Sequence, residues 1–201
     1  MSTAGPLGEI ALFPLHTVLF PGGLLPLRVF EPRYMEMVSA CLRENAAFGI
    51  CLISEGREVG SPAVPHPVGC LARIAQWDMQ QLGVLQIVAC GERRFRILSR
   101  RVQPDGLARA EIELLAEEGD EAVPEDCAIG VRLLQAIVDE GQAPGIEKPF
   151  RFESASWVSA RLAEVLPLPT AMKQKLLEMN EGGRRLGELC NFLREQKLED
   201  K

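Results

Sequence analysis

Apolar and polar positions in the first part of the chain follow the short, interrupted runs that are typical of β-strands. Two apolar runs, 9–15 and 24–30, flank a Pro-Gly-Gly turn at 21–23. Pro26 lies inside the second run, and because proline has no backbone N–H, it indicates a strand at a sheet edge or at a bulge. Further strand-like runs are 48–53, 70–77, 84–91 and 93–102. The pattern predicts a β-rich meander or barrel.

One helix is predicted among these strands. Pro32 suits its first position, where the missing N–H of proline costs no hydrogen bond. The apolar residues that follow recur three, four, seven and eight positions apart, and therefore share one helical face. They are Tyr34, Met37, Val38, Cys41 and Leu42. We expect this helix to begin at Pro32 and to pack its apolar face against the strands.

A Gln-Pro-Asp-Gly turn at 103–106 follows the last of these runs and precedes another apolar run, 107–115. With Pro104 and Asp105 as a two-residue loop, the two runs form a hairpin in which apolar residues face each other and opposite charges meet. The predicted pairs are Phe95 with Leu114, Arg96 with Glu113, and Ile97 with Ile112.

The period changes from strand-like to helical after an acidic segment, 116–126, which holds six acids and is predicted to be a solvated linker. Four apolar stripes at helical spacing then predict a small bundle with short loops. These stripes lie within 127–138, 155–166, 172–179 and 186–193. Thr170 is a plausible N-cap of the third helix, and Gly182-Gly183 is expected to break the chain before the fourth. We predict two domains, 1–118 and 119–201.

Charge divides the chain in the same way. Residues 1–115 carry 11 acids and 11 basic residues, whereas the remainder carries 17 acids and 11 basic residues and accounts for the net charge of −6. A hydrophobic content of 47% and a charged content of 25% are typical of a globular protein. No basic residue precedes Arg28, and prolines interrupt the apolar opening, so neither a secretory signal nor a membrane-spanning helix is predicted. We expect a cytoplasmic protein.

Residues for catalysis or metal binding are sparse. None of the six cysteines has CxxC spacing, and free cysteine is usually a small buried hydrophobe. A metal site built from Cys51, Cys70 and Cys90 with His66 is a weaker alternative, as is a hydrolase that pairs Cys70 with His66. His16, in the apolar opening, is expected to be structural. The sequence thus predicts no metal, no cofactor and no catalysis.

Several stretches resemble the Lon protease N-terminal domain (LON substrate-binding) family. They are LFPLHTVLFPGGLLPLRVFEPRY at 12–34, GCLARI at 69–74, GERRFRI at 91–97, and LPLPTAMKQKLLEMNEGGRRLGELCNFL at 166–193. The resemblance implies an α+β fold, in which a PUA-like β-barrel with one packed helix precedes a C-terminal helical bundle. Lon proteases continue into ATPase and protease modules, but this sequence has no Gly-Lys pair for a Walker A loop and no GxSxG. It therefore resembles a free-standing LON domain.

The resemblance implies a non-catalytic module that recognises exposed apolar segments of unfolded or partly folded proteins. Expected binding surfaces are a groove between the two domains and the edge left by the proline-bearing strands. The loop 55–69 and apolar residues near Trp77 and Trp157 are candidate liners. The candidate peptide-binding residues are Glu31, Arg33, Tyr34, His66, Trp77, Arg94 and Arg96.

Two of these features have a competing structural interpretation, which we favour. Glu31 and Arg33 fit a clamp that fixes the strand–helix corner, with the carboxylate near the helix N-terminus, better than the mouth of a groove. The arginines within 93–101 fit the solvated face of a strand. Alternative functions are an RNA-binding module that uses this stripe and an adaptor that docks onto a separate protease. Overall acidity disfavours nucleic acid, and no membrane partner is expected.

Overall fold

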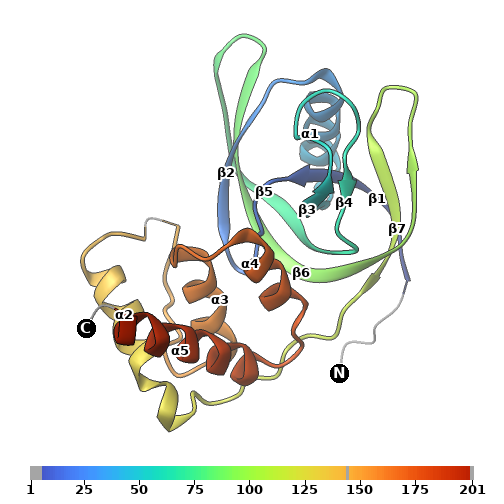
Figure 1. Cartoon of the computed structure of the whole chain (residues 1–201). Coiled ribbons are helices and arrows are strands. Elements are labelled where there is room, and N and C mark those ends of the chain that lie inside the picture. Colours follow the sequence, from blue (N-terminus) through green and yellow to red (C-terminus); the bar gives the residue numbers. More distant parts are fainter. Residues whose placement is uncertain (1–5, 144, 200–201) are drawn as a thin grey trace. The chain divides into compact units, whose positions relative to one another are not determined.

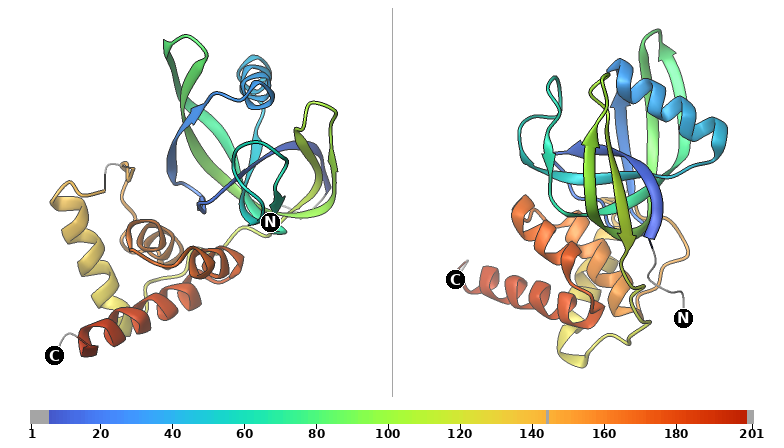
Figure 2. Two further views of the ribbon diagram at one scale, coloured as in Figure 1. Left: turned by 45° about the horizontal axis from the view of Figure 1, so that its top comes forward. Right: turned by 90° about the vertical axis from the view of Figure 1, so that its right-hand side faces the viewer.

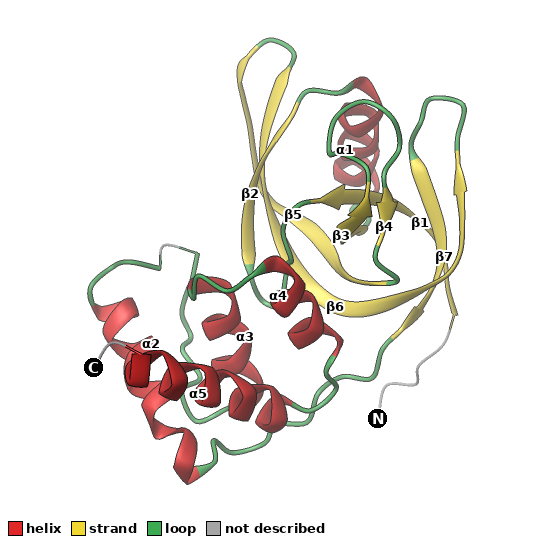
Figure 3. Ribbon diagram, in the orientation of Figure 1, coloured by secondary structure: helices red, strands yellow, loops and turns green. Residues whose placement is uncertain are grey.

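The computed structural model describes residues 6–143 and 145–199. The chain forms two compact units, residues 1–116 and 117–201 (Figure 1). All strands of the described residues belong to the first unit, and the second contains helices (Figure 3). The predicted combination of a β-sheet domain with helices at the C-terminus is therefore confirmed.

Seven strands make up the sheet of the first unit. They are β1 (Pro6–Leu15), β2 (Leu24–Val29), β3 (Phe48–Glu55), β4 (Val64–Pro65), β5 (Val68–Gln81), β6 (Val84–Val102) and β7 (Ala108–Leu114). Antiparallel pairing joins β1 to β7, β7 to β6, β6 to β5, and β5 to β3, and β3 pairs in parallel with β1. The pairing thus returns to its starting strand. The relation to PUA-like barrels stays a prediction.

β6 is a single strand of 19 residues, where the apolar pattern predicted two runs. At Gly91 the loop before β2 crosses this strand closely. Gly22 N–H donates to the Gly91 carbonyl at 2.8 Å, and Gly91 N–H donates to the Gly23 carbonyl at 2.9 Å. A Cβ at Gly91 would lie 2.3 Å from the Phe20 carbonyl oxygen, so this crossing needs glycine.

The predicted register of β6 and β7 is confirmed, although the predicted two-residue loop is wrong. The three predicted pairs are present: Phe95 with Leu114, Arg96 with Glu113, and Ile97 with Ile112. The hairpin loop has five residues, 103–107, because β6 ends at Val102 and β7 begins at Ala108. A bulge between Ile97 and Ser99 inserts Leu98 into β6 and restores the register.

The main core of the first unit lies between the sheet and α1 (Pro32–Glu44), which begins at Pro32 as predicted (Figure 2). The buried face of α1 contains Tyr34, Met37, Val38 and Cys41. These side chains share one apolar cluster with residues of five strands, among them Phe13 and Ile87. A second, smaller cluster surrounds Phe95 and Ile112.

The second unit contains η1 (Glu125–Cys127), α2 (Ala128–Asp139), α3 (Ala155–Val165), α4 (Thr170–Glu178) and α5 (Gly182–Glu199). Two predicted boundaries are wrong. Pro169 occupies the N-cap of α4, and Thr170 is its first helical residue. Gly182 and Gly183 are the first two residues of α5 and do not form a break before the helix. Within the described ranges, no helix combines the length and apolar character that a membrane span needs.

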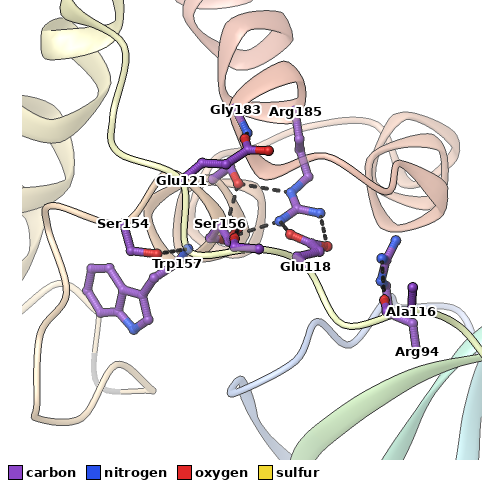
Figure 4. Close-up of polar contacts among 11 residues, drawn as sticks. Arg94, Ala116, Glu118, Glu121, Ser154, Ser156, Trp157, Gly183 and Arg185 are labelled. Atoms are coloured by element: carbon purple, nitrogen blue, oxygen red, sulfur yellow. Dashed lines mark hydrogen bonds and ion pairs between the residues drawn. The ribbon is translucent and has the colours of Figure 1, made fainter. Parts of the chain in front are cut away.

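The acidic segment before these helices is mostly exposed, as the sequence predicted, but it is bonded to the second unit and is not a free linker. Glu118 forms a bidentate ion pair with Arg185 of α5, at 2.7 and 2.6 Å (Figure 4). Glu121 Oε2 accepts a hydrogen bond from Gly183 N–H at 2.9 Å, which satisfies one of the free donors at the start of α5. Ala122 also forms a β-bridge with Ser154. The segment is therefore part of the second unit.

Candidate functional site: the unpaired edge of β2

β2 is an edge strand of the first unit. Leu24–Val29 pairs with Leu85–Cys90 of β6, and no other strand of the described residues pairs with β2. Pro26 lies in the middle of this strand, in agreement with the predicted edge or bulge position. In Figure 1 the hairpin of β5 and β6 continues past the end of β2. An edge of this kind leaves backbone groups open to pairing with another strand.

A cavity of about 250 Å³, here called the β2 cavity, opens beside this edge. Its lining residues come from β1, β2, the start of α1 and the loop after β3. They are Phe13, Leu15, Pro26, Leu27, Arg28, Val29, Phe30, Glu31, Tyr34, Glu58 and Val59. Most of these side chains are apolar, and Phe30 and Val59 are 53% and 56% exposed. The β2 cavity is therefore an apolar recess with a few charged groups around it.

Aromatic and charged contacts hold the α1 side of the β2 cavity in place. The Tyr34 ring stacks on Phe13 with 4.2 Å between ring centroids, and the Arg33 guanidinium lies 4.6 Å from the Tyr34 centroid. Arg33 Nη2 donates to Glu31 Oε2 at 2.9 Å, and Arg33 Nη1 donates to the Gly106 carbonyl at 3.1 Å. These bonds tie the β2–α1 corner to the β6–β7 turn.

The opposite wall is a loop that is fastened at two points. The His16 backbone N–H donates to Glu58 Oε1 at 2.5 Å, and the Gly60 N–H donates to Glu31 Oε2 at 3.4 Å. Burial raises the pKa of the Tyr34 hydroxyl; nearby Arg33 opposes this shift, and the carboxylates of Glu31 and Glu58 add to it. The Tyr34 hydroxyl therefore stays protonated at neutral pH and can act as a hydrogen-bond donor.

A second hollow of about 430 Å³, here called the Trp77 hollow, lies across β2, β6 and β5. Its lining residues are Pro26, Leu27, Arg28, Gln76, Trp77, Asp78, Gln86, Ile87 and Val88. In the sheet register, Leu27 and Trp77 both face Ile87, so one row of apolar side chains crosses the three strands. Trp77 is 59% exposed. The two recesses share Pro26, Leu27 and Arg28, so both adjoin β2.

The structure brings together only some of the predicted site residues. Glu31 and Tyr34 line the β2 cavity, and Trp77 lines the Trp77 hollow. Arg33 is buried behind Tyr34 and is absent from the lining of both recesses.

The other three predicted residues lie elsewhere in the first unit. The His66 N–H donates to the Leu52 carbonyl at 2.8 Å, next to β4. Arg94 is buried and donates to the Ala116 carbonyl at 3.4 Å, whereas Arg96 is exposed in β6. A role for these residues in peptide binding stays a prediction.

Sequence reasoning missed several residues that line the β2 cavity, notably Phe13, Leu15 and Phe30. Pro26 was the available signal, because it marked the strand as an edge. Glu58 and Val59 belong to the loop 55–69. The sequence predicts a lining role for this loop but does not indicate which of its residues take part. The pairing of distant strands determines which side chains of β1 lie beside this edge. The local sequence pattern gives no information on that pairing.

Several arginines of the β6 stripe are bonded to other protein groups. Arg101 donates to both carboxylate oxygens of Glu9, at 2.5 and 2.8 Å, and Arg109 of β7 lies 3.0 Å from the same carboxylate. The hydrogen bond from Arg101 lowers the pKa of Glu9. Arg100 Nη1 donates to the Ala63 carbonyl at 2.8 Å. Among the described residues there is also no group of three or more His, Cys, Asp or Glu side chains that could hold a metal.

Comparison with known proteins identifies the family. Residues 9–195 match the ATP-dependent protease La (LON) substrate-binding domain. A Lon N-terminal domain protein from Xanthomonas campestris has a crystal structure that superposes with a TM-score of 0.77, at 34% identity, over 91% of this chain and 97% of that one. The N-terminal domain of a Mycobacterium avium complex Lon protease shares the fold, with a TM-score of 0.68 at 22% identity, over 92% of this chain and 97% of that one.

Cereblon proteins match a shorter part of the chain. Protein cereblon of Gallus gallus is 32% identical over 103 residues, which are 50% of this chain and 22% of that protein. Protein cereblon of Xenopus tropicalis is 28% identical over 113 residues, 54% of this chain and 24% of that protein. The matched region thus spans less than a quarter of these relatives. Because the family match extends over nearly all of the sequence, the chain belongs to the family of Lon substrate-binding domains.

Proposed function

We propose that the first unit binds extended, apolar segments of unfolded or partly folded proteins at the unpaired edge of β2. The observation that carries this proposal is the position of β2, which pairs with β6 alone among the described strands and lines the apolar β2 cavity. A strand added to such an edge gains main-chain hydrogen bonds, and recesses for alternate side chains give selectivity. Membership of a substrate-binding family supports this function.

The exposed apolar side chains around the edge support an apolar ligand. Phe30 and Val59 line the β2 cavity, and Trp77 lines the Trp77 hollow. Each of these side chains is more than half exposed. Contiguous apolar surface of this kind is typical of protein-binding sites. Side chains two positions apart in an extended peptide point to the same side and lie about 7 Å apart. One peptide can therefore place apolar side chains in the β2 cavity from every second position.

We infer that the module is not an enzyme and needs no cofactor, since its family is a substrate-binding domain and the recesses are lined mainly by apolar groups. Nucleic-acid binding through the arginine stripe is less favoured, because Glu9 pairs with Arg101 and the Ala63 carbonyl accepts a hydrogen bond from Arg100. An adaptor that brings captured segments to a separate protease would use the same binding event. It differs only in needing a second surface.

Fluorescence anisotropy with a defined peptide tests the proposal. The probe is a fluorescein-labelled, uncharged octapeptide with alternating valine and phenylalanine at its centre and serine and glycine at its ends. Phe30→Ser removes an apolar side chain that is 53% exposed and lines the β2 cavity, and Leu98→Ser is a matched control that is 55% exposed and lines neither recess.

We expect Phe30→Ser to raise the Kd of this peptide about tenfold and Leu98→Ser to leave it within about twofold. Both side chains are largely exposed, so neither change is expected to unfold the domain, which circular dichroism verifies. Equal effects of the two substitutions, or no binding of the peptide to the wild-type protein at millimolar concentration, would overturn the proposal.

A further inference from the structure

A groove of about 580 Å³ in the second unit, here called the methionine groove, has no role in the function proposed above. It is open on one side and lies between α4 and the first turns of α5. Its lining residues are Met172, Lys175, Leu176, Met179, Arg184 and Glu188. The first four recur at helical spacing along one face of α4 and its C-cap, so the groove follows that face.

Apolar side chains form the floor of the methionine groove. Leu176 is buried, with 2% of its surface exposed, and Met172 and Met179 are half-buried on either side of it. Methionine side chains are unbranched and flexible, so a surface that they line can adapt to apolar groups of different shape. The floor thus suits an apolar side chain without requiring one particular residue.

Two cations at the groove lack a partner within the described residues, and this sets them apart from most others in the unit. Arg185 is bound to Glu118, Arg151 to Asp120, and Lys173 Nζ to the Glu164 carbonyl. No hydrogen bond or ion pair joins Lys175 or Arg184 to any described group, and both are exposed.

The lining of the methionine groove carries a net positive charge, because Lys175 and Arg184 outnumber its one acid. Arg184 lies in the first turn of α5, where the Glu121 carboxylate accepts a hydrogen bond from Gly183 N–H but does not pair with Arg184. Glu188 is one turn further along and is the single acid of the lining. A ligand that brings a carboxylate between Lys175 and Arg184 would offset this charge.

We propose that the methionine groove binds a segment of a partner protein in which an apolar side chain lies next to a carboxylate. The apolar side chain packs on Met172, Leu176 and Met179, and the carboxylate accepts hydrogen bonds from Lys175 and Arg184. The occupant is a polypeptide because neighbouring residues of one chain can supply both the apolar side chain for the floor and the carboxylate for the two cations. This second site does not depend on peptide binding at β2, and it would let one molecule hold two different segments.

Two labelled peptides test the site by anisotropy. Both are octapeptides with a central leucine; in one it is followed by aspartate, and in the other by asparagine. The variants are the double substitution Lys175→Gln with Arg184→Gln, and Arg132→Gln as the matched control, since Arg132 is an exposed α2 arginine away from the groove. Phe30→Ser, which affects only the proposed site on β2, serves as a second control.

We expect the wild-type protein to bind the aspartate peptide about threefold to tenfold more tightly than the asparagine peptide at low salt. The double variant should lose this preference, and Arg132→Gln and Phe30→Ser should keep it. Met172→Gln should weaken both peptides alike, because it changes the floor and not the cations. Equal affinity of the two peptides for the wild-type protein, or a preference that survives the double substitution, would overturn the proposal.

Discussion

Arg185 and Glu118 form a buried, bidentate ion pair that connects α5 to the acidic segment at the start of the second unit. Arg185 Nη1 and Nη2 lie 2.7 and 2.6 Å from the two carboxylate oxygens, and the Arg185 side chain is 2% exposed. Arg185 Nε also donates to Ser159 Oγ at 3.0 Å, and Nη2 donates to the Ser156 carbonyl at 3.2 Å. The Arg185 guanidinium therefore joins α5 to two other parts of the unit, the acidic segment and α3 (Figure 4).

Breaking this pair from one side should destabilise the second unit strongly. Glu118→Gln leaves the buried Arg185 charge without its counter-ion, and we expect the free energy of unfolding to fall by about 3 kcal/mol. The control is Asp120→Asn in the same segment, because Asp120 pairs with Arg151 at 2.7 Å but the two side chains are 68% and 47% exposed. That change should cost less than about 1 kcal/mol. Urea unfolding followed by far-ultraviolet circular dichroism compares them, and similar losses would contradict the assignment.

Two glycines of α5 should respond to alanine with opposite signs. A Cβ at Gly182 would lie 2.5 Å from Ser156 Cα and 2.7 Å from Ser156 N, so Gly182→Ala forces the two helices apart. We expect a loss of about 2 kcal/mol. Gly187 has open space around its Cβ position, and Gly187→Ala should stabilise the helix by about 0.5–1 kcal/mol. Thermal unfolding measures both, and a destabilising Gly187→Ala would show that α5 is packed differently there.

Arg33 should behave as a structural residue of the corner rather than as a peptide ligand. It is buried, it bonds to Glu31 and the Gly106 carbonyl, and it lines neither recess. We expect Arg33→Gln to lower the free energy of unfolding by about 3 kcal/mol and to leave the Kd of the folded protein for the valine–phenylalanine peptide within about twofold. Lost affinity at unchanged stability would favour the alternative, in which Arg33 lies at the mouth of a groove.

Alkaline pH should weaken the fold through its buried thiols. Burial raises the pKa of Cys51 to about 12, from 9.0 for a free thiol. Because the folded state keeps this proton while the unfolded state releases it, the stabilisation is complete below pH 9 and is lost as the pH rises toward 12, at up to about 1.4 kcal/mol per pH unit. Cys51→Ala should flatten this dependence in urea unfolding between pH 8 and 11. Parallel curves for the two proteins would contradict it.

Local sequence chemistry predicted the features that depend on neighbouring residues. Pro32 marked the start of α1, and the charge and apolar pairs of 95–97 with 112–114 set the β6–β7 register. The register was right although the loop was wrong, because the bulge at Leu98 compensates for the longer turn. Side-chain pairing across strands determined the outcome more strongly than turn length.

Features that depend on distant residues could not be predicted. The parallel pairing of β1 with β3 and the contact of Phe13 with Tyr34 join parts of the chain whose local patterns are independent. The acidic composition of 116–126 predicts the exposure that the structure has, but not the ion pair of Glu118 with Arg185, 67 residues away. The candidate site could be predicted as an edge strand from Pro26, and its recesses could not.

Hydrogen exchange of the β2 amides tests the central claim most directly. Exchange is followed by mass spectrometry with and without a saturating amount of the valine–phenylalanine peptide, and segment 24–29 is compared with α5, residues 182–199. A peptide that pairs with the free edge of β2 protects its open backbone N–H groups. The account predicts slower exchange in 24–29 and no change in 182–199. Unchanged exchange in 24–29 while the peptide is bound would contradict it.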